Sequence, residues 1–263
     1  MSLCGGRLPD SLLPPNPANS TGYWEPNSAV QVNARFLKAS GSSFFDTQLI
    51  QEIAEDSPLV RQFVAEIAEL LRACRGTPAE APMIFKEPRV SVLLPPWLAA
   101  VKQTELSPRV VIPVRHPNEV ASSLGAWKGL SWAHTSELWL KYNLLAERHT
   151  RHLPRAFVSY EALLANWRRE VHTISRALGL ALTPNDAVDQ FLDPELRHRI
   201  SRDQAPSNET PWLRDVYRAL DTACRGGNLD VDLLDAAFLD LSRAQAAGSL
   251  RVVRSFGTDF GAT

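Results

Sequence analysis

The sequence predicts an α/β fold in which a central parallel sheet lies between layers of helices. Three short apolar runs predict buried strands, and they lie at 83–86, 109–115 and 155–159. Segments with helical periodicity separate these runs, so each crossover between strands contains a helix. Because such crossovers are right-handed and cover both faces of a sheet, we expect the strands to be parallel neighbours in a three-layer sandwich.

Helices are expected before, between and after the strands, at about 28–39, 47–74, 92–103, from 117 onward, 132–151 and 161–178. The helix from 117 opens with proline at its first position and Glu119 in its first turn. Residues 184–263 are expected to be mainly helical and to belong to the same single domain, residues 1–263. Pro113 has no N–H for a ladder, so we expect an edge or a bulge at that point of its strand.

Composition excludes several classes of protein. In 263 residues, 28 basic side chains nearly balance 29 acidic ones, so no global field would recruit nucleic acid or an acidic membrane. No apolar stretch approaches the length of a membrane span, and the N-terminus lacks the features of a signal peptide. Neither the three cysteines nor the six histidines have metal-ligand spacing. We therefore expect a cytoplasmic protein with reduced thiols and no metal site.

The junction that follows the strand at 109–115 predicts an anion site. Arg115 lies at the carboxyl end of this strand, and Ser123 lies about two turns into the helix that Pro117 opens. A guanidinium and a hydroxyl would then converge on the crevice where open α/β sheets bind ligands. An anion, most simply a phosphate, fits there.

This junction resembles the 3′-phosphate-binding motif of sulfotransferases, in which an arginine and a serine eight residues later hold the 3′-phosphate of 3′-phosphoadenosine 5′-phosphosulfate (PAPS). Further segments resemble bacterial sulfotransferase-type proteins, in the same order, over about residues 12–180. They are NPANSTGYWE at 16–25, FKEPR at 85–89, LLPPWL at 93–98, ELWLKYN at 137–143 and PRAFVSYEALL at 154–164.

The resemblance implies a P-loop NTPase-like α/β fold and a sulfotransferase activity. PAPS would be the donor substrate, and the sulfuryl group would pass to a hydroxyl or amine of a small-molecule, glycan or peptide acceptor. The resemblance implies no nucleic-acid partner, no membrane partner and no metal.

The resemblance also implies catalytic residues. Similar sulfotransferases place a lysine beside the transferred group at the strand end where Lys86 lies, although Lys86 could equally form a salt bridge. Many family members have a histidine two residues later as the general base, but Pro88 stands there in this chain. The role of base then passes to Glu25 or Glu87, since a carboxylate can accept a hydroxyl proton. Either one could instead be structural, with Glu25 at a helix start and Glu87 paired with Arg89.

Aromatic residues offer further candidates. Tyr160 follows the strand at 155–159, as a tyrosine does near the donor's adenine in related enzymes, and it could stack on a base or pack in the core. Four tryptophans are expected in the core or in the wall of an acceptor pocket, namely Trp97, Trp127, Trp132 and Trp139. The basic segment at 197–202 could be a solvated helix face or a lid over the donor phosphates.

One element of the family pattern is missing from the sequence. Active members open with a strand and a glycine-rich loop that cradles the 5′-phosphosulfate, yet none of the 13 glycines begins such a loop. SLCGGRLP at 2–9 resembles the end of the first family helix, so we expect that strand and loop to be absent. An exposed sheet edge would favour pairing with another chain as a homo-oligomer. The alternative function is a non-catalytic nucleotide-binding or scaffolding relative. A P-loop kinase is weaker, because the Walker lysine is missing.

Overall fold

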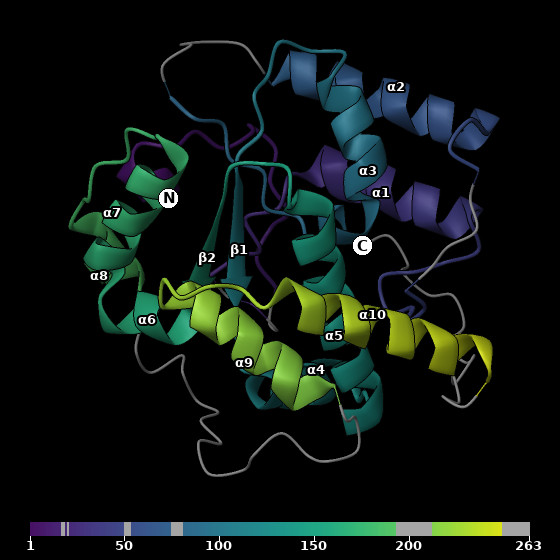
Figure 1. Cartoon of the computed structure of the whole chain (residues 1–263). Helices are drawn as coiled ribbons and strands as arrows, with labels where there is room; N and C mark the ends of the chain where they lie inside the picture. The colour runs from purple at the N-terminus through teal and green to yellow at the C-terminus, as the bar shows by residue number, and fades with distance from the viewer. Residues whose placement is uncertain (17–18, 20, 50–53, 75–80, 193–211, 249–263) are drawn as a thin grey trace.

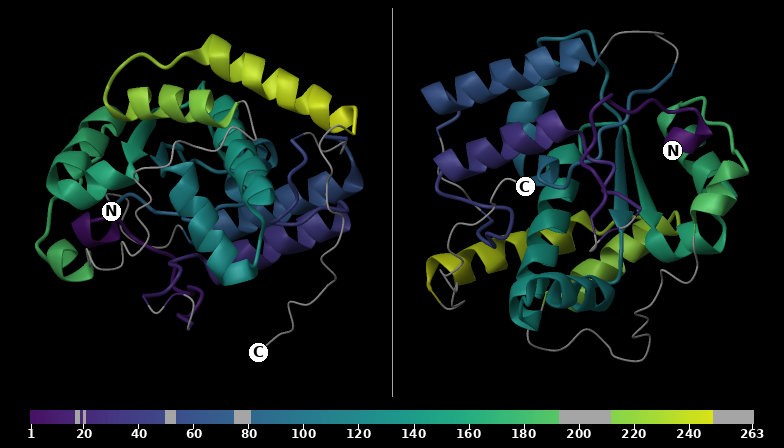
Figure 2. Two further views of the ribbon diagram at one scale, coloured as in Figure 1. Left: turned by 90° about the horizontal axis from the view of Figure 1, so that it is seen from below. Right: turned by 180° about the vertical axis from the view of Figure 1, so that it is seen from behind.

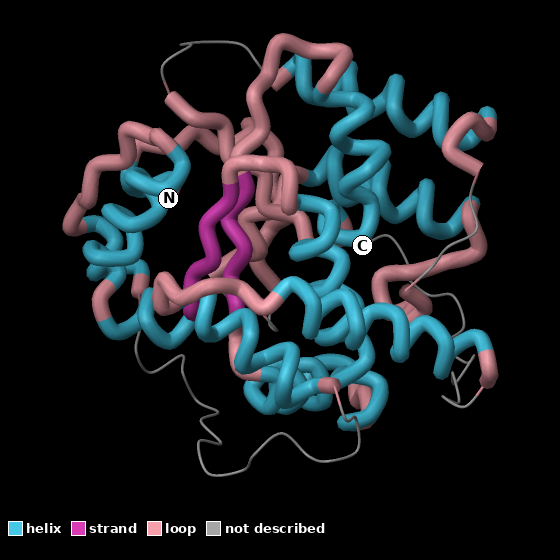
Figure 3. The backbone as a smooth tube through the Cα atoms, in the orientation of Figure 1, coloured by secondary structure: helices cyan, strands magenta, loops and turns pink. Residues whose placement is uncertain are grey.

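The computed structural model describes residues 1–16, 19, 21–49, 54–74, 81–192 and 212–248. Within them, ten α-helices surround a sheet of two strands, β1 (Val110–Val114) and β2 (Arg155–Ser159) (Figures 1 and 3). The protein is therefore a mixed α/β structure with a small parallel sheet. No helix in the described part of the chain is both long and apolar enough to cross a membrane.

The pairing of β1 with β2 confirms two of the three predicted strands and their parallel direction. The register joins Val110 to Arg155 and continues to Val114 and Ser159. The backbone N–H of Val110 donates to the carbonyl of Pro154 at 3.0 Å. Along a strand, the backbone groups of successive residues point alternately toward the partner strand and away from it. Since Val110 points toward β2, residue 113 points away from it, to the free edge of β1. Pro113 therefore removes no hydrogen bond between the two strands.

The third predicted strand, at 83–86, does not join this sheet, so that part of the prediction is wrong. Met83 forms only an isolated parallel bridge with Arg7. The N–H of Arg7 donates to the carbonyl of Pro82 at 2.9 Å, and the N–H of Ile84 donates to the carbonyl of Arg7 at 2.8 Å. The run at 83–86 is too short to extend this single bridge into a strand, because Pro88 follows it and α3 (Val90–Val101) begins two residues after Pro88.

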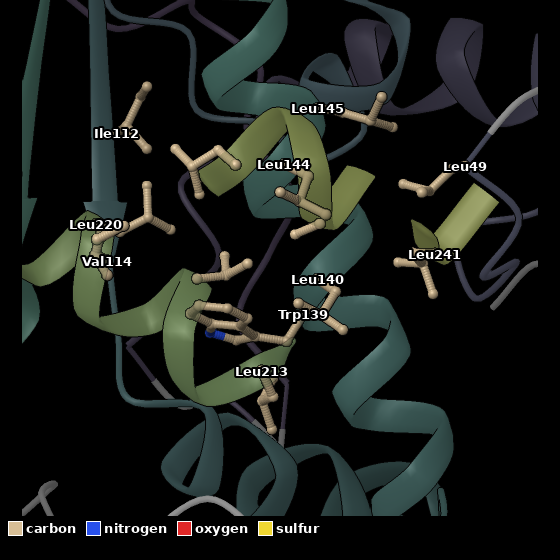
Figure 4. Packing of buried hydrophobic residues seen from close by; sticks show 14 residues of the cluster. Leu49, Ile112, Val114, Trp139, Leu140, Leu144, Leu145, Leu213, Leu220 and Leu241 are labelled. Atoms are coloured by element: carbon tan, nitrogen blue, oxygen red, sulfur yellow. The ribbon is translucent and has the colours of Figure 1, made fainter. Parts of the chain in front are cut away.

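One face of the sheet packs against α5 (Trp132–Thr150), α9 (Leu213–Cys224) and α10 (Val231–Ala246). Ile112 and Val114 point into this cluster, which is rich in leucine and also contains Trp139 (Figure 4). Alternate residues of a strand point to opposite faces, so the spacing of these two β1 residues places them together in one hydrophobic core.

The opposite face of the sheet is covered as well. Ala156 and Val158 pack with α7 (Trp167–Leu178) and with the 3-10 turn η1 (Ser2–Cys4). Figures 1 and 2 show α7 and the N-terminus on the side of the sheet away from α5. Both faces of the sheet are therefore covered, although Pro113 of β1 stays exposed.

A separate cluster forms from α1 (Asn27–Ala39), α2 (Pro58–Ala73) and α3. Trp97 lies buried in it and packs edge-on against Phe85, with ring centroids 5.9 Å apart. This cluster fixes the segment 85–89 beside the first helix, and that segment carries Lys86 and Glu87.

Two predicted helices have different limits in the structure because their caps decide where they begin. The helix expected at 47–74 begins only at Pro58, where the Ser57 hydroxyl accepts the N–H of Val60 at 3.2 Å. The helix expected at 161–178 is split into α6 (Tyr160–Ala165) and α7. Asn166 breaks it, with its side chain accepting the N–H of Arg169 at 3.1 Å.

The helical prediction for the C-terminal part is confirmed where the structure describes it, in α8 (Ala187–Phe191), α9 and α10. Residues 193–211 and 249–263 lie outside the described residues, and so does the basic segment at 197–202. The helix that Pro117 opens is α4 (Pro117–Lys128), and it starts where the sequence predicts.

Candidate functional site

The carboxyl ends of the two strands bring together two of the predicted donor-binding residues. Arg115 follows the last residue of β1, and Tyr160 follows the last residue of β2. The Arg115 guanidinium lies over the Tyr160 ring, 4.5 Å from its centroid. Figure 1 shows both arrows ending at the edge of the sheet where α4, α6 and α9 lie. Parallel neighbours end at one edge, which explains how residues 45 positions apart meet.

Two side chains fix Arg115 in this position. The indole N–H of Trp139 donates to its backbone carbonyl at 2.9 Å, which ties the end of β1 to α5. The Nε of Arg115 donates to the Glu119 carboxylate at 2.9 Å, one turn along α4. Since this ion pair uses Nε, the two terminal nitrogens are the ones that a bound anion would contact.

Ser123, the third predicted donor-binding residue, lies exposed on α4. Arg115 lies just before this helix, whose N-cap is His116; the His116 ring Nδ1 accepts the N–H of Asn118 at 3.2 Å. Arg115 contacts Tyr160 directly, whereas Ser123 lies about two turns along the helix. A ligand large enough to reach from the strand end to the second turn of α4 would be needed to join them.

The C-terminal helix α9 adds a residue that the sequence did not single out. The ring of Tyr217 packs edge-on against His116, with centroids 4.7 Å apart, and it also contacts Trp139. Burial lowers the pKa of His116, although the carboxylates of Glu119 and others oppose the shift. No local pattern signals Tyr217, because its contacts are about a hundred residues away in the chain.

A second group of predicted residues is formed by Lys86 and Glu25. The Lys86 ammonium donates to a Glu25 carboxylate oxygen at 2.6 Å and to the backbone carbonyl of Tyr23 at 3.0 Å. The side chain of Lys86 is 51% exposed, whereas that of Glu25 is 9% exposed. The lysine thus reaches from the surface over a nearly buried carboxylate, which leaves one of its three N–H donors beyond these two bonds.

Glu87 points the other way from Lys86, as expected for neighbours on an extended segment. Its buried carboxylate accepts hydrogen bonds from Asn33 and Arg89, and the indole N–H of Trp97 donates to the amide oxygen of Asn33 at 2.9 Å. Burial raises the pKa of Glu87 even though the Arg89 guanidinium opposes the shift, and the charge of Glu25 raises it further. Glu87 therefore faces the interior, and it lies close enough to Glu25 for their charges to interact.

The tryptophans divide between the core and the surface. Trp97 and Trp139 are buried in two different hydrophobic clusters, so of the two predicted locations, the core and the wall of an acceptor pocket, these two occupy the core. Trp127 is 40% exposed on α4, and the Lys128 ammonium lies 4.3 Å from its ring centroid. In the described residues, no group of three or more His, Cys, Asp or Glu side chains is arranged to hold a metal ion.

Comparison with known proteins identifies no relative of this chain. No family model matches the chain, and no curated protein or solved structure is significantly similar to it. The chemistry of the site must therefore be argued from its residues. A cation and an aromatic plane at the strand ends suit an anionic nucleotide, and a lysine paired with a carboxylate suits proton and anion transfer.

Proposed function

We propose that this protein is a sulfotransferase that moves a sulfuryl group from PAPS to a hydroxyl or amine. The observation that carries the proposal is the contact between Arg115 and Tyr160 at the carboxyl ends of adjacent parallel strands. The ordered motifs over about residues 12–180 support it. The proposal includes a three-layer, P-loop NTPase-like arrangement around the observed sheet and a cytoplasmic location.

The donor nucleotide would lie across the carboxyl ends of β1 and β2. The terminal nitrogens of Arg115 would bind its 3′-phosphate, with the Ser123 hydroxyl as a second donor from α4. The Tyr160 ring would contact the adenine base. The positive end of α4 would add to the attraction, since a helix N-terminus favours an anion.

Transfer would use Lys86 and Glu25. The hydroxyl oxygen or amine nitrogen of the acceptor attacks sulfur, the bond from sulfur to the bridging oxygen of the donor breaks, and Glu25 accepts the proton that the acceptor loses. The Lys86 ammonium stabilises negative charge that develops on the bridging oxygen, which leaves with adenosine 3′,5′-bisphosphate. The product is a sulfate ester or sulfamate of the acceptor. Glu87, buried between Asn33 and Arg89, would support this segment rather than accept the proton.

A second candidate is a non-catalytic nucleotide-binding or scaffolding relative. It is favoured by the glycine pattern, because none of the 13 glycines begins a phosphate-binding loop. One hydrogen-bond donor to a developing negative charge contributes about 3–4 kcal/mol to stabilising a transition state. Binding through Arg115 could therefore occur without measurable transfer.

Calorimetry with adenosine 3′,5′-bisphosphate tests the proposed donor site. Arg115→Ala should weaken binding by about tenfold to a hundredfold, as expected for a charge-assisted contact with phosphate. Arg169→Ala is the matched control, because Arg169 is an exposed arginine on α7 that pairs with its neighbour Glu170. Equal affinities in Arg115→Ala and the unmodified protein would remove Arg115 from the site. Binding without transfer from PAPS would favour the non-catalytic relative.

A further inference from the structure

Trp24 has a backbone conformation that a bulky side chain rarely adopts. Its φ is 58°, and in the described part of the chain every other residue with positive φ is a glycine. In this left-handed region the Cβ atom crowds the following carbonyl oxygen, so glycine or asparagine normally occupies it. A tryptophan held there is strained, and such strain collects at functional sites.

Lys86 holds the strained residue from both sides. Its ammonium binds the carbonyl of Tyr23 at 3.0 Å and the carboxylate of Glu25 at 2.6 Å, the residues immediately before and after Trp24. The base of the loop is closed as well, since the N–H of Leu13 donates to the carbonyl of Glu25 at 2.8 Å. The fold thus fixes the backbone of Trp24 against its intrinsic preference.

Core packing does not explain why a tryptophan occupies this position. The residue is 40% exposed, and its indole packs edge-on against Phe191, which is 41% exposed, with ring centroids 5.7 Å apart. The indole nitrogen lies over Gly22, where an added Cβ would come within 3.9 Å of it. Two partly exposed aromatic rings therefore meet at Trp24, whose chain neighbours Tyr23 and Glu25 both bind Lys86.

The segment that leads to Trp24 carries no charge. Residues 11–24 contain no acidic or basic side chain. The hydroxyl of Tyr23 donates to the Asn16 amide oxygen at 3.2 Å, and the hydroxyl of Thr21 donates to the Asn19 amide oxygen at 3.0 Å. The amides and hydroxyls of this segment, together with the aromatic face of Trp24, suit a neutral ligand that has many hydroxyl groups. A charged peptide would find no complementary charge in this loop.

We propose that Trp24 and Phe191 form a binding platform for a pyranose ring, which makes a carbohydrate the acceptor. The C–H groups on one face of a pyranose are attracted to the negative face of the indole. A hydroxyl of the bound sugar could then approach Glu25, which adjoins Trp24 in the chain. This inference rests on the proposed function for the transfer step, but binding to the platform needs no donor.

Saturation-transfer NMR without donor tests the platform with methyl glycosides of glucose, galactose and mannose and with their β-linked and α-linked disaccharides. We expect at least one to bind, and we expect Trp24→Gly to weaken its binding by about tenfold or more, because the main aromatic contact is lost. Trp24→Phe should stay within about threefold, since it keeps an aromatic face. Leu239→Ala, which removes an exposed apolar side chain from α10, should bind as the unmodified protein does.

The positive φ of Trp24 allows Trp24→Gly to be checked for correct folding. Glycine adopts positive φ without strain, so Trp24→Gly should melt at the same temperature as the unmodified protein or above it. Loss of sugar binding would then not result from unfolding. The proposed platform would be overturned if none of these sugars bound, or if their binding were unchanged in Trp24→Gly. It would also be overturned if p-nitrophenol, an aromatic probe without a sugar ring, bound in their place.

Bisphosphate binding, measured on the same samples, separates this inference from the proposed function. Sugar binding that depends on Trp24, together with no bisphosphate binding, would retain the platform and reject the sulfotransferase. Bisphosphate binding that depends on Arg115, together with no binding of any of the sugars, would reject the platform alone.

Discussion

Arg115 is held between a carboxylate and an aromatic ring, and the carboxylate competes with any anion that the site would bind. Glu119 accepts a hydrogen bond from the Arg115 Nε at 2.9 Å; the Glu119 side chain is nearly buried and that of Arg115 is partly exposed. Glu119 lies in the first turn of α4, where its negative charge also interacts favourably with the positive end of the helix dipole. Glu119 therefore orients the guanidinium while it reduces the local positive potential.

Replacing Glu119 by glutamine should strengthen the binding of adenosine 3′,5′-bisphosphate. Glutamine can still accept the bond from Arg115, but it removes the negative charge that repels a phosphate. We expect affinity to rise about twofold to tenfold, the range of partly exposed ion pairs, when calorimetry compares it with the unmodified protein. Asp221→Asn, which alters an exposed arginine pair on α9, should change the affinity less. Weaker binding in Glu119→Gln would mean that the carboxylate does not face the ligand.

Lys86 should matter for transfer and not for bisphosphate binding. Lys86→Met keeps the aliphatic stem but removes the ammonium that binds Glu25 and the Tyr23 carbonyl. We expect release of bisphosphate from PAPS to fall by about a hundredfold to a thousandfold, because the lost interaction forms mainly in the transition state. Lys102→Met, at the exposed end of α3, is the control. An unchanged rate in Lys86→Met would exclude Lys86 from the chemistry.

At the scale of elements, α5 organises the segment 44–47. The hydroxyl of Tyr142 donates to the carbonyl of Phe44 at 2.9 Å, and the ammonium of Lys141 donates to the carbonyl of Asp46 at 2.7 Å. Phe44 in turn lies under the Arg89 guanidinium, 4.6 Å from its ring centroid. One helix face thus connects this segment to Arg89, the ion-pair partner of Glu87.

Lys141 should make stability depend on pH. Its side chain is 1% exposed, and burial lowers its pKa from 10.5 to about 8, although Asp46 opposes the shift. Between these values the unfolded chain binds more protons than the folded one, so the free energy of unfolding should rise with pH in this window. Burial of the charged Lys141 therefore destabilises the fold by about 3 kcal/mol below pH 8, and this destabilisation is absent above pH 10.5.

Urea unfolding of the unmodified protein and of Lys141→Met, at pH values between 8 and 10.5, measures this contribution as a difference. The comparison cancels other groups, such as Cys224 and Tyr217, whose burial raises their pKa to about 12 and acts in the opposite direction. The unmodified protein should gain stability relative to Lys141→Met as pH rises. A difference that stays constant would show that Lys141 is not desolvated.

Local sequence signals predicted some elements well and others poorly. The strand at 155–159 and the start of α4 followed from an apolar run and from Pro117, because both signals act within a few residues. The start of α2 was missed, although Ser57 and Pro58 are a recognisable cap, because the predicted helix was extended through them to residue 47. The strand at 83–86 failed because strand formation needs a partner, and its partner is a single residue, Arg7.

The candidate site shows the same division. The parallel strand pairing was predicted, and it brings Arg115 and Tyr160 to one edge of the sheet, although their direct contact was not predicted. The bond from Lys86 to Glu25 could not be predicted, because it depends on how a proline-rich loop closes beside α1. Tyr217 has no local signature at all, since only the packing of α9 brings it to His116.

At the scale of the whole molecule, three hydrophobic clusters support the two groups of candidate residues. Two clusters bury the opposite faces of the sheet and position Arg115 and Tyr160 at its edge. The third packs α1, α2 and α3 together and positions the segment that carries Lys86. The proposed function assigns donor binding to the first group and transfer to the second.

The most direct test of this assignment compares the thermal stabilisation given by adenosine 3′,5′-bisphosphate with that given by 5′-AMP, which lacks the 3′-phosphate. A ligand at about 100 times its Kd adds about 2.7 kcal/mol, which raises the melting temperature of a chain of this size by several degrees. We predict a shift of that size with the bisphosphate, a much smaller one with 5′-AMP at the same concentration, and loss of the difference in Arg115→Ala. Equal shifts from the two nucleotides in the unmodified protein would contradict a 3′-phosphate site at the end of β1.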